Sequence, residues 1–586
     1  MSARRLMAVL CLWASAVVAA AAAPLSAVAP SSEQVLPNGQ PLLVLCYHDV
    51  APALVPGADP LTVDSATLAA HLNWLRSEKY VAIDLQTLVD AYAGTARLPE
   101  RAVLLTFDDG YESAYTQVFP LLRAFAMPAV VALVGQWMQT PSQLTVRYGE
   151  SDVPRDHFIS WDQAREMQAS GLVEFASHSW DLHHGIEGDP AGSVEPAATT
   201  HAYLRDAGYE SDRAWRERVR SDLERNSVLL AERLGRRPRA IVWPYGRYNA
   251  QAEQIASDLG MPIGFTLDSG RRSERAPISR IRRLLIDGNP APGRFAHLVR
   301  AHDDAPTVRF VQVNLDRLPA PGSAGFEPGL NRLLEHIRAL GVETVVLQAF
   351  AQPARSGRIE AVYFPNRQLP MRADLLNPVA WRIATSTQAR VYASMPLEGF
   401  ALDPMPEDPD AQLRVGELFE DLGKAAYFQG LLLGGSRAGA PLEQTSARAA
   451  TLASRSRAWQ PQLRTALRLQ VDREVPLSTQ VAVALRDHEY LVIERGASDS
   501  ASSDADVAAA VASIQGAAPR TIVAIPAPPG SAAHANARAQ ALLRAGLPNL
   551  GVIDLDLDGS ATELATLTSA LSLRSRLAQA TGVTGP

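Results

Sequence analysis

Cysteine is nearly absent from this sequence, because 586 residues contain only Cys11 and Cys46. Cys11 lies in an N-terminal segment that we expect to be removed. The mature chain would then keep one cysteine and could form no intrachain disulfide bond. A large excess of charge of one sign is also absent, since the formal net charge is -7. This balance gives no reason to expect a nucleic-acid partner.

Long apolar runs are confined to the N-terminus. Residues 4–5 are basic, residues 6–18 are apolar and alanines follow, which is typical of a secretory signal. A small-x-small cleavage site indicates that residues 1–22 are the signal peptide. Lipid attachment at Cys11 is not expected, because Leu10 stands where a small residue is needed. No later apolar run reaches the roughly eighteen residues of a membrane span. We therefore expect a soluble protein exported to the periplasm.

The rest of the composition is that of an ordinary globular protein, with 47% hydrophobic and 20% charged residues. A chain of this length exceeds a single hydrophobic core, which predicts two domains of about 250 residues each. The stretch 301–306 is polar and unfavourable for a helix. We expect the boundary there, between domains at residues 33–300 and 307–586.

Strand-like apolar runs alternate with helical segments in both halves. In the first half, runs at 42–49, 81–83 and 102–107 enclose helical segments at 65–79 and 85–93. This βαβ order predicts a parallel sheet with helices outside it. The second half shows the same alternation, which predicts a second (β/α) barrel. Its expected strands lie at 308–313, 344–348, 388–394, 430–433, 479–484, 521–525 and 551–555.

Two adjacent carboxylates follow the apolar run at 102–107. Asp108, Asp109 and Gly110 stand where the strand should end, and strand ends are where α/β folds keep their chemistry. Because the backbone turns there, one carboxylate can hold a metal ion while the other accepts a proton. The tripeptide alone is more typical of a plain turn. Histidines elsewhere in the chain favour a site.

Histidines follow two further predicted strands. His178, His183 and His184 come after the run at 173–177, and a loop must bring them together because their spacing does not match one helical face. Imidazole nitrogens with a carboxylate suit zinc or a similar divalent ion. His184 competes with His183 for one ligand position. His48, at the end of the first strand, is either a structural hydrogen bonder or a catalytic group.

Three motifs in this order resemble those of the polysaccharide deacetylases of carbohydrate esterase family 4, which have the NodB-homology fold. They are Thr106-Phe107-Asp108-Asp109-Gly110, His178-Ser179-x3-His183 and Trp243-Pro244-Tyr245-Gly246. Tyr47-His48-Asp49 is similar to the circularly permuted periplasmic branch that acts on poly-β-1,6-N-acetylglucosamine. The resemblance implies a deformed (β/α)7-type deacetylase barrel followed by a (β/α)8 TIM-like barrel.

The resemblance also implies roles for the residues after the strands. Asp109, His178 and His183 would bind a divalent metal ion, either zinc or else nickel, cobalt or iron. Asp108 would be the general base and His48 the general acid.

The third motif would complete this site. The backbone N–H of Tyr245 would help to hold the oxyanion, and Trp243 and Pro244 would contact the sugar, although a tryptophan is more often a core residue. The wider family has an arginine at the position of Val242. Another residue must then orient Asp108, and Arg239 is the candidate.

The second half resembles the glycan-binding, hydrolase-like domain of the same enzymes. The match runs through 347–350, 363–367 and 369–375 and fades after about Glu420. It implies sugar contacts from Tyr363, Phe364, Arg372 and Asp374.

One departure concerns hydrolysis in this second domain. Family members carry an acidic pair after the Phe-x-Gly turn, whereas this chain has Gly434-Gly435-Ser436. Glycosidic cleavage needs a carboxylic acid. We expect the domain to bind glycan without cutting it, unless another carboxylate such as Asp316 supplies the acid.

The expected function is partial N-deacetylation of exported poly-β-1,6-N-acetylglucosamine during maturation of a biofilm exopolysaccharide, with an outer-membrane export porin as a possible partner. One alternative is a deacetylase of peptidoglycan or chitin-like oligomers, and another is a catalytically silent module that binds polysaccharide for export. The paired carboxylates and histidines argue against the silent module, which has no need of them.

Overall fold

The structure is a computed structural model of the chain. It describes residues 34–36, 39–149, 151–268, 277–300, 307–353, 355–387, 389–402, 409–434, 440–470, 475–494, 501–555 and 561–572. The expected signal peptide lies outside the described residues. So do Gly435 and Ser436, two of the three residues that replace the acidic pair of the family. The chain divides into two compact units, residues 1–188 with 194–304, and residues 189–193 with 305–586.

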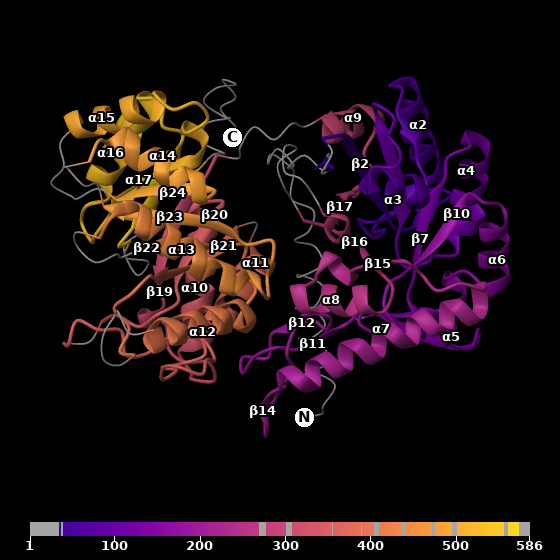
Figure 1. Ribbon diagram of the computed structural model, residues 1–586, viewed down its shortest axis with the longest axis horizontal. Coiled ribbons are helices and arrows are strands. Elements are labelled where there is room, and N and C mark those ends of the chain that lie inside the picture. Colours follow the sequence, from indigo (N-terminus) through magenta and orange to yellow (C-terminus); the bar gives the residue numbers. More distant parts are fainter. Residues whose placement is uncertain are drawn as a thin grey trace, which may run out of the picture. The chain divides into compact units, whose positions relative to one another are not determined.

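The first unit is built on a nearly closed parallel sheet with helices outside it (Figure 1). Its strands are β2 (Pro41–Tyr47), β6 (Ala102–Phe107), β7 (Ala129–Leu133), β10 (Val173–Ser177), β15 (Ala240–Val242), β16 (Ile263–Thr266) and β17 (Ile281–Arg282), paired in that order. The next strand, β18 (Leu284–Leu285), pairs with β2 and joins the two ends of the sheet. The short strands β1 (Gln34–Val35) and β5 (Val81–Ala82) pair with β2 and β6.

The helices of this unit cover apolar strands. They are α2 (Ser65–Ser77), α3 (Leu85–Ala93), α4 (Phe119–Phe125), α5 (Gly135–Gln139), α6 (Trp161–Ala169), α7 (Asp212–Leu234), α8 (Ala250–Asp258) and α9 (Pro292–Arg300). Every residue of β6 is buried, as expected for a parallel strand covered on both faces. At α6, Ser160 and Gln163 form the reciprocal bonds of a capping box, which defines the start of this helix.

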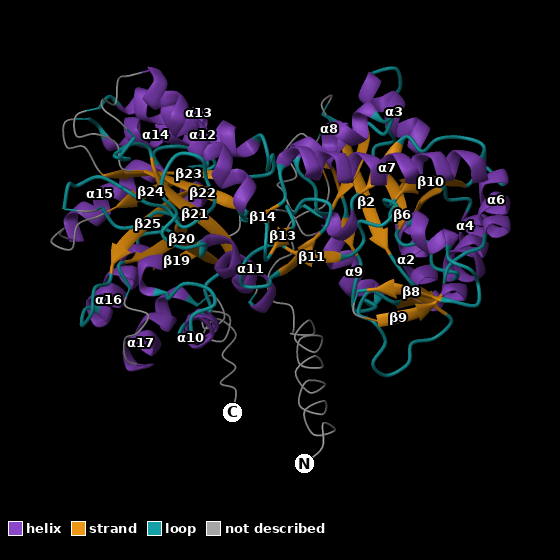
Figure 2. Ribbon diagram, turned by 90° about the horizontal axis from the view of Figure 1, so that it is seen from below, coloured by secondary structure: helices purple, strands orange, loops and turns teal. Residues whose placement is uncertain are grey.

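Short two-stranded sheets decorate the loops of the first unit. They are β3 (Val50–Ala51) with β4 (Val63–Asp64), β8 (Thr145–Tyr148) with β9 (Ser151–Pro154), β11 (Gly185–Glu187) with β12 (Val194–Pro196), and β13 (Tyr203–Leu204) with β14 (Gly208–Tyr209). The β8–β9 hairpin, seen in Figure 2, occupies part of the sequence in which no regular periodicity is evident.

The second unit is a closed barrel of eight parallel strands. They are β19 (Arg309–Asn314), β20 (Thr344–Gln348), β21 (Arg390–Pro396), β22 (Gly430–Gly434), β23 (Arg464–Gln470), β24 (Tyr490–Glu494), β25 (Thr521–Pro526) and β26 (Asn549–Ile553). The helices are α10 (Phe326–Leu340), α11 (Leu376–Ser386), α12 (Pro409–Ala425), α13 (Leu442–Arg457), α14 (Leu477–Asp487), α15 (Ala501–Ala512), α16 (Ala532–Arg544) and α17 (Ala561–Leu571). The two predicted barrel architectures are thus confirmed.

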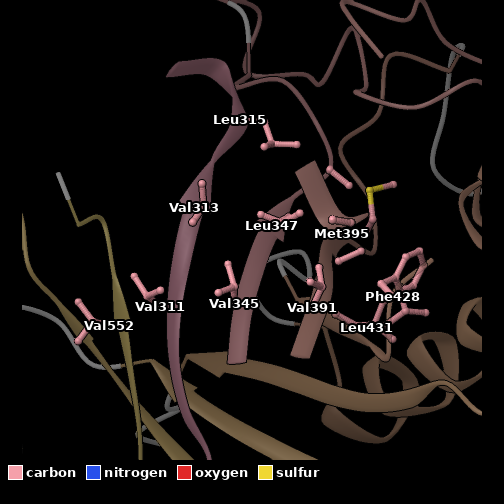
Figure 3. Packing of buried hydrophobic residues seen from close by; sticks show 14 of the residues in the cluster. Val311, Val313, Leu315, Val345, Leu347, Val391, Met395, Phe428, Leu431 and Val552 are labelled. Carbon is pink, nitrogen blue, oxygen red and sulfur yellow. The ribbon is translucent and has the colours of Figure 1, made fainter. Parts of the chain in front are cut away.

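The side chains of the barrel strands alternate between the helices and the lumen. Val311, Val313, Val345 and Leu347 belong to the larger apolar cluster that includes residues of the surrounding helices (Figure 3). Phe310 and its counterparts on the other strands form a separate cluster. The barrel is therefore a packed core in this part and not a pore.

One predicted strand of the second unit is wrong. Residues 479–484 lie within the helix α14, whose buried side chains Val481, Ala484 and Leu485 follow helical spacing. The strands of this region are β23 and β24 instead, and Arg464 and Arg468 obscure the apolar pattern of β23.

Candidate functional site

The predicted site residues follow the carboxyl ends of strands in the first unit. His48 comes after β2, Asp108 and Asp109 after β6, and His178 after β10. Since neighbouring parallel strands end at the same edge of the sheet, these side chains meet there.

The turns at this edge have unusual backbone conformations. Asp109, Ser179 and Tyr245 have φ values of 71°, 70° and 58°, in the left-handed region that L-residues seldom adopt. Gly110 has a φ of +70°, and a Cβ atom there would lie 2.5 Å from a methyl group of Leu133. Such strained backbone is concentrated at functional sites.

Three buried side chains bring their ligand atoms together. Oδ1 of Asp109 lies 3.3 Å from Nε2 of His178 and 3.3 Å from Nε2 of His183. Two ligands held at about 2.0–2.1 Å by a tetrahedral ion are about 3.3 Å apart. The donor set, one carboxylate oxygen and two imidazole nitrogens, also suits zinc and similar divalent ions. The residues therefore fit a metal ion with open coordination positions.

The second shell orients these donors. Nδ1 of His178 lies 2.7 Å from the carbonyl oxygen of Val242, so this nitrogen carries the proton and Nε2 presents its lone pair. The hydroxyl of Tyr148 donates to Oδ2 of Asp109 at 3.0 Å. The carboxylate thus keeps Oδ1 toward the two histidines.

The electrostatics favour the metal-binding protonation states, an ionised Asp109 and a neutral His183. Burial acts to raise the pKa of Asp109, but the neighbouring histidines outweigh it and hold this pKa well below its usual range. Burial lowers the pKa of His183 to about 4. Burial also disfavours the charged form of His178, but the interaction with the Asp109 carboxylate raises its pKa. In the absence of a cation, His178 can therefore hold a proton beside Asp109.

The loop between the two histidines is anchored on α7. The carboxylate of Asp222 accepts hydrogen bonds from the N–H groups of Trp180 and Asp181, at 2.8 and 2.7 Å. One helical turn along, Asn226 donates to Oγ of Ser177 at 2.8 Å. This anchoring explains how residues without a common helical face come together.

His184, the alternative ligand, is not part of this cluster. Its Nδ1 lies 3.7 Å from Asp181, and its side chain is 41% exposed. The structure therefore brings His183 to Asp109.

Arg283 orients the second carboxylate, Asp108. Its Nη1 and Nη2 donate to Oδ1 and Oδ2 at 2.6 and 2.8 Å, and its side chain is fully buried in the one-residue gap between β17 and β18. Burial opposes ionisation of Asp108, but the charge of Arg283 keeps its pKa below the ordinary value.

The assignment of Arg239 to this role is wrong. Arg239 pairs with both oxygens of Glu174, at 2.8 and 2.9 Å. It stands just before β15, whereas the site lies past the opposite end of this strand.

His48 and Cys46 complete the surroundings of Asp108. Nε2 of His48 lies 4.0 Å from Oδ2 of Asp108, and Sγ of Cys46 lies 3.5 Å from the same oxygen. These three residues could also be grouped as metal ligands. A cation is not favoured there, because the Arg283 guanidinium already occupies both carboxylate oxygens.

The residues of the third motif have different environments. The Tyr245 side chain is 41% exposed, and its ring lies 4.6 Å from that of His183. Trp243 is completely buried, and Pro244 is also buried. A buried indole offers no face to a sugar, so Trp243 is a core residue and the predicted contact is corrected.

In the second unit, some of the predicted sugar contacts form a polar cluster after β19. Asp316 accepts hydrogen bonds from the hydroxyl of Tyr363, from Nη1 of Arg372 at 2.7 Å and from the N–H of Gln352 at 2.9 Å. These three donors tie the Asp316 carboxylate into contacts within the protein.

The burial of the other predicted contacts varies. Phe364 is completely buried and Tyr363 is 1% exposed, so neither ring offers a stacking face. The side chain of Arg372 is 56% exposed, whereas Asp374 is buried. The predicted stacking of sugar on the rings of Tyr363 and Phe364 is therefore corrected.

Sequence comparison finds a family match in each of the two units. Residues 95–264 match the family described as Polysaccharide deacetylase, and residues 312–408 match the family described as Hypothetical glycosyl hydrolase family 13. The first unit is thus similar to the polysaccharide deacetylases over residues 95–264.

Individual relatives resemble both halves. The chain is 36% identical over 398 residues to the poly-beta-1,6-N-acetyl-D-glucosamine N-deacetylase of Escherichia coli K12, a match that covers 64% of this chain and 59% of the relative. The BpsB deacetylase domain from Bordetella bronchiseptica is 42% identical, with a TM-score of 0.38, over 42% of this chain and 95% of that domain. The PgaB (BpsB) glycoside hydrolase domain of the same organism is 25% identical, with a TM-score of 0.40, over 46% of this chain and 99% of that domain.

Proposed function

We propose that this protein is a metal-dependent hydrolase that removes acetyl groups from some residues of exported poly-β-1,6-N-acetylglucosamine during maturation of a biofilm exopolysaccharide. The observation that carries the proposal is the convergence of Asp109, His178 and His183, beside a second carboxylate that is held by a buried arginine. The name of the Escherichia coli relative supports the linkage of the substrate.

A divalent ion held by Asp109, His178 and His183 would polarise the acetamide carbonyl and lower the pKa of water. Asp108 is the general base, because Arg283 keeps it ionised and fixes both of its oxygens. The backbone N–H of Tyr245 assists at the oxyanion.

His48 gives the departing amine its proton. Its Nε2 lies 4.0 Å from Asp108, so the acid and the base lie close to one reaction centre. Its Nδ1 is buried and has no hydrogen-bond partner among the described residues. Asp108 is thus assigned the removal of a proton from water, and the adjacent His48 is assigned the delivery of a proton to the amine.

The second barrel binds the polymer without cutting it. Arg372 and Asp316 offer polar groups at the carboxyl end of β19, and Gly434 ends β22 without a carboxylate. A bound chain would be held near the deacetylase at raised effective concentration. Truncation after about residue 300 should weaken action on long polymers more than on short oligomers, and incubation with partially deacetylated polymer should leave its size unchanged. Progressive shortening would contradict the binding-only role.

The setting follows from the expected signal peptide. We place the protein in the periplasm, where the polymer passes before it leaves through an outer-membrane porin. Within the described residues, no helix has both the length and the apolar character needed to cross a membrane.

The decisive experiment measures acetate released by the purified protein from β-1,6-linked and β-1,4-linked N-acetylglucosamine polymers. We expect release from the β-1,6 polymer, and its loss after chelation while the fold persists. Preference for the β-1,4 polymer would favour a deacetylase of chitin or peptidoglycan. Absence of release from both, with binding retained, would favour a silent binding module.

A further inference from the structure

We propose that Tyr148 is a positioning residue that keeps Asp109 a one-oxygen metal ligand and so preserves an open coordination position. The inference rests on the proposed metal-dependent function and assigns a role to a residue outside the motifs of the family resemblance.

The contact that carries this inference is local and specific. Tyr148 ends β8, and its hydroxyl donates to Oδ2 of Asp109 at 3.0 Å. The other oxygen, Oδ1, is the one that lies 3.3 Å from each histidine. One carboxylate therefore presents one oxygen to the metal site and the other to a phenol.

Packing fixes the position of this phenol. Val146, two residues earlier on the same strand, is buried in an apolar cluster with Trp137 and Phe158. The Tyr148 ring lies 5.3 Å from the ring of Trp137 and 5.8 Å from that of His183. Packing therefore places the hydroxyl in position to donate to Oδ2 of Asp109.

A carboxylate that is free of such a partner can offer both oxygens to a cation, since carboxylates bind metal ions in both one-oxygen and two-oxygen modes. Two-oxygen binding by Asp109 would add a ligand atom and take a position that a catalytic site keeps open for water or substrate. Loss of the hydroxyl should therefore preserve metal binding and impair turnover. A merely stabilising tyrosine would not separate these two properties.

The test compares wild-type protein, Tyr148→Phe and the matched control Tyr115→Phe. Tyr115 also donates its hydroxyl to a carboxylate, that of Glu166 at 2.7 Å, but it lies on the short helix before α4, away from the metal ligands. Each full-length, metal-free protein is titrated with Co²⁺, and its dissociation constant, visible absorption spectrum, melting temperature and rate of acetate release are measured.

For Tyr148→Phe we expect Co²⁺ affinity equal to or higher than that of the wild type, a weaker visible band that reports a higher coordination number, and turnover lower by about tenfold or more. The control should match the wild type in all three. Unchanged turnover, an unchanged spectrum, or affinity that falls in step with turnover would each overturn the inference. Failure of the wild type itself to bind Co²⁺ or to release acetate would instead refute the proposed function.

Discussion

Arg283 offers a sharp test of how Asp108 is kept ready for catalysis. Both members of this pair are buried, and the guanidinium donates to both carboxylate oxygens at 2.6 and 2.8 Å. Removing one partner of such a pair leaves an uncompensated buried charge, which typically costs about 3–5 kcal/mol. We expect Arg283→Ala to lower the free energy of unfolding by about this amount. Turnover per folded molecule should also fall, because Asp108 loses its orientation and burial favours its protonated form.

A double-mutant cycle separates the interaction between Arg283 and Asp108 from a general loss of stability. In an Asp108→Asn background the carboxylate charge is gone, so the cost of Arg283→Ala should fall well below its value in the wild type. Chemical denaturation measures the four free energies, and acetate release corrected for the folded fraction measures turnover. Equal costs in the two backgrounds, or full turnover in Arg283→Ala, would refute the assigned role.

Arg239 supplies the matched control. It pairs with both oxygens of Glu174, but this pair is partly exposed, with side-chain accessibilities of 32% and 18%, and it stands before β15. Exposed and partly exposed pairs typically contribute up to about 1 kcal/mol. Arg239→Ala should therefore cost little stability and leave turnover unchanged.

Other predictions follow from the same site. His48→Ala should lower turnover about a hundredfold if His48 is the general acid; a loss of melting temperature in step with activity, with turnover per folded molecule retained, would identify a structural histidine instead. Asp222→Ala should weaken Co²⁺ binding about 10–100-fold because it releases the loop that carries a metal ligand. The control Glu224→Gln, at an exposed position of α7, should not weaken it. Equal affinities in the two variants would contradict the anchoring role. In metal-free protein, Asp108 and Asp109 have lowered pKa values. Their contribution to stability is therefore present above the unfolded pKa of about 4 and should be lost as the pH falls below it. Stability that rises on acidification from pH 5 to 3 would contradict this assignment.

Much of the site could be predicted because its residues directly follow apolar strands. The end of β6 carries Asp108 and Asp109. Parallel pairing through the intervening β7 puts this end at the same edge of the sheet as the end of β10, which precedes His178. Order along the chain therefore translates into proximity in space.

The missed residues have no such local signal. Arg283 lies 175 positions from Asp108 in the sequence, and only closure of the sheet by β18 brings it back. A buried arginine in an apolar last strand was the available hint, since such a charge needs a partner. Tyr148 lies on a hairpin whose short strands show little periodicity, so its contact with Asp109 depends on tertiary packing.

Metal content and turnover of two neighbouring variants test the central claim most directly. Asp109→Ala removes one of three protein ligands, and Asp108→Asn removes the base while preserving its shape. The account predicts that Asp108→Asn retains one divalent ion per chain while its acetate release falls by about a hundredfold or more, and that Asp109→Ala loses both the ion and the activity. An Asp109→Ala protein with full metal content and normal turnover would contradict the account.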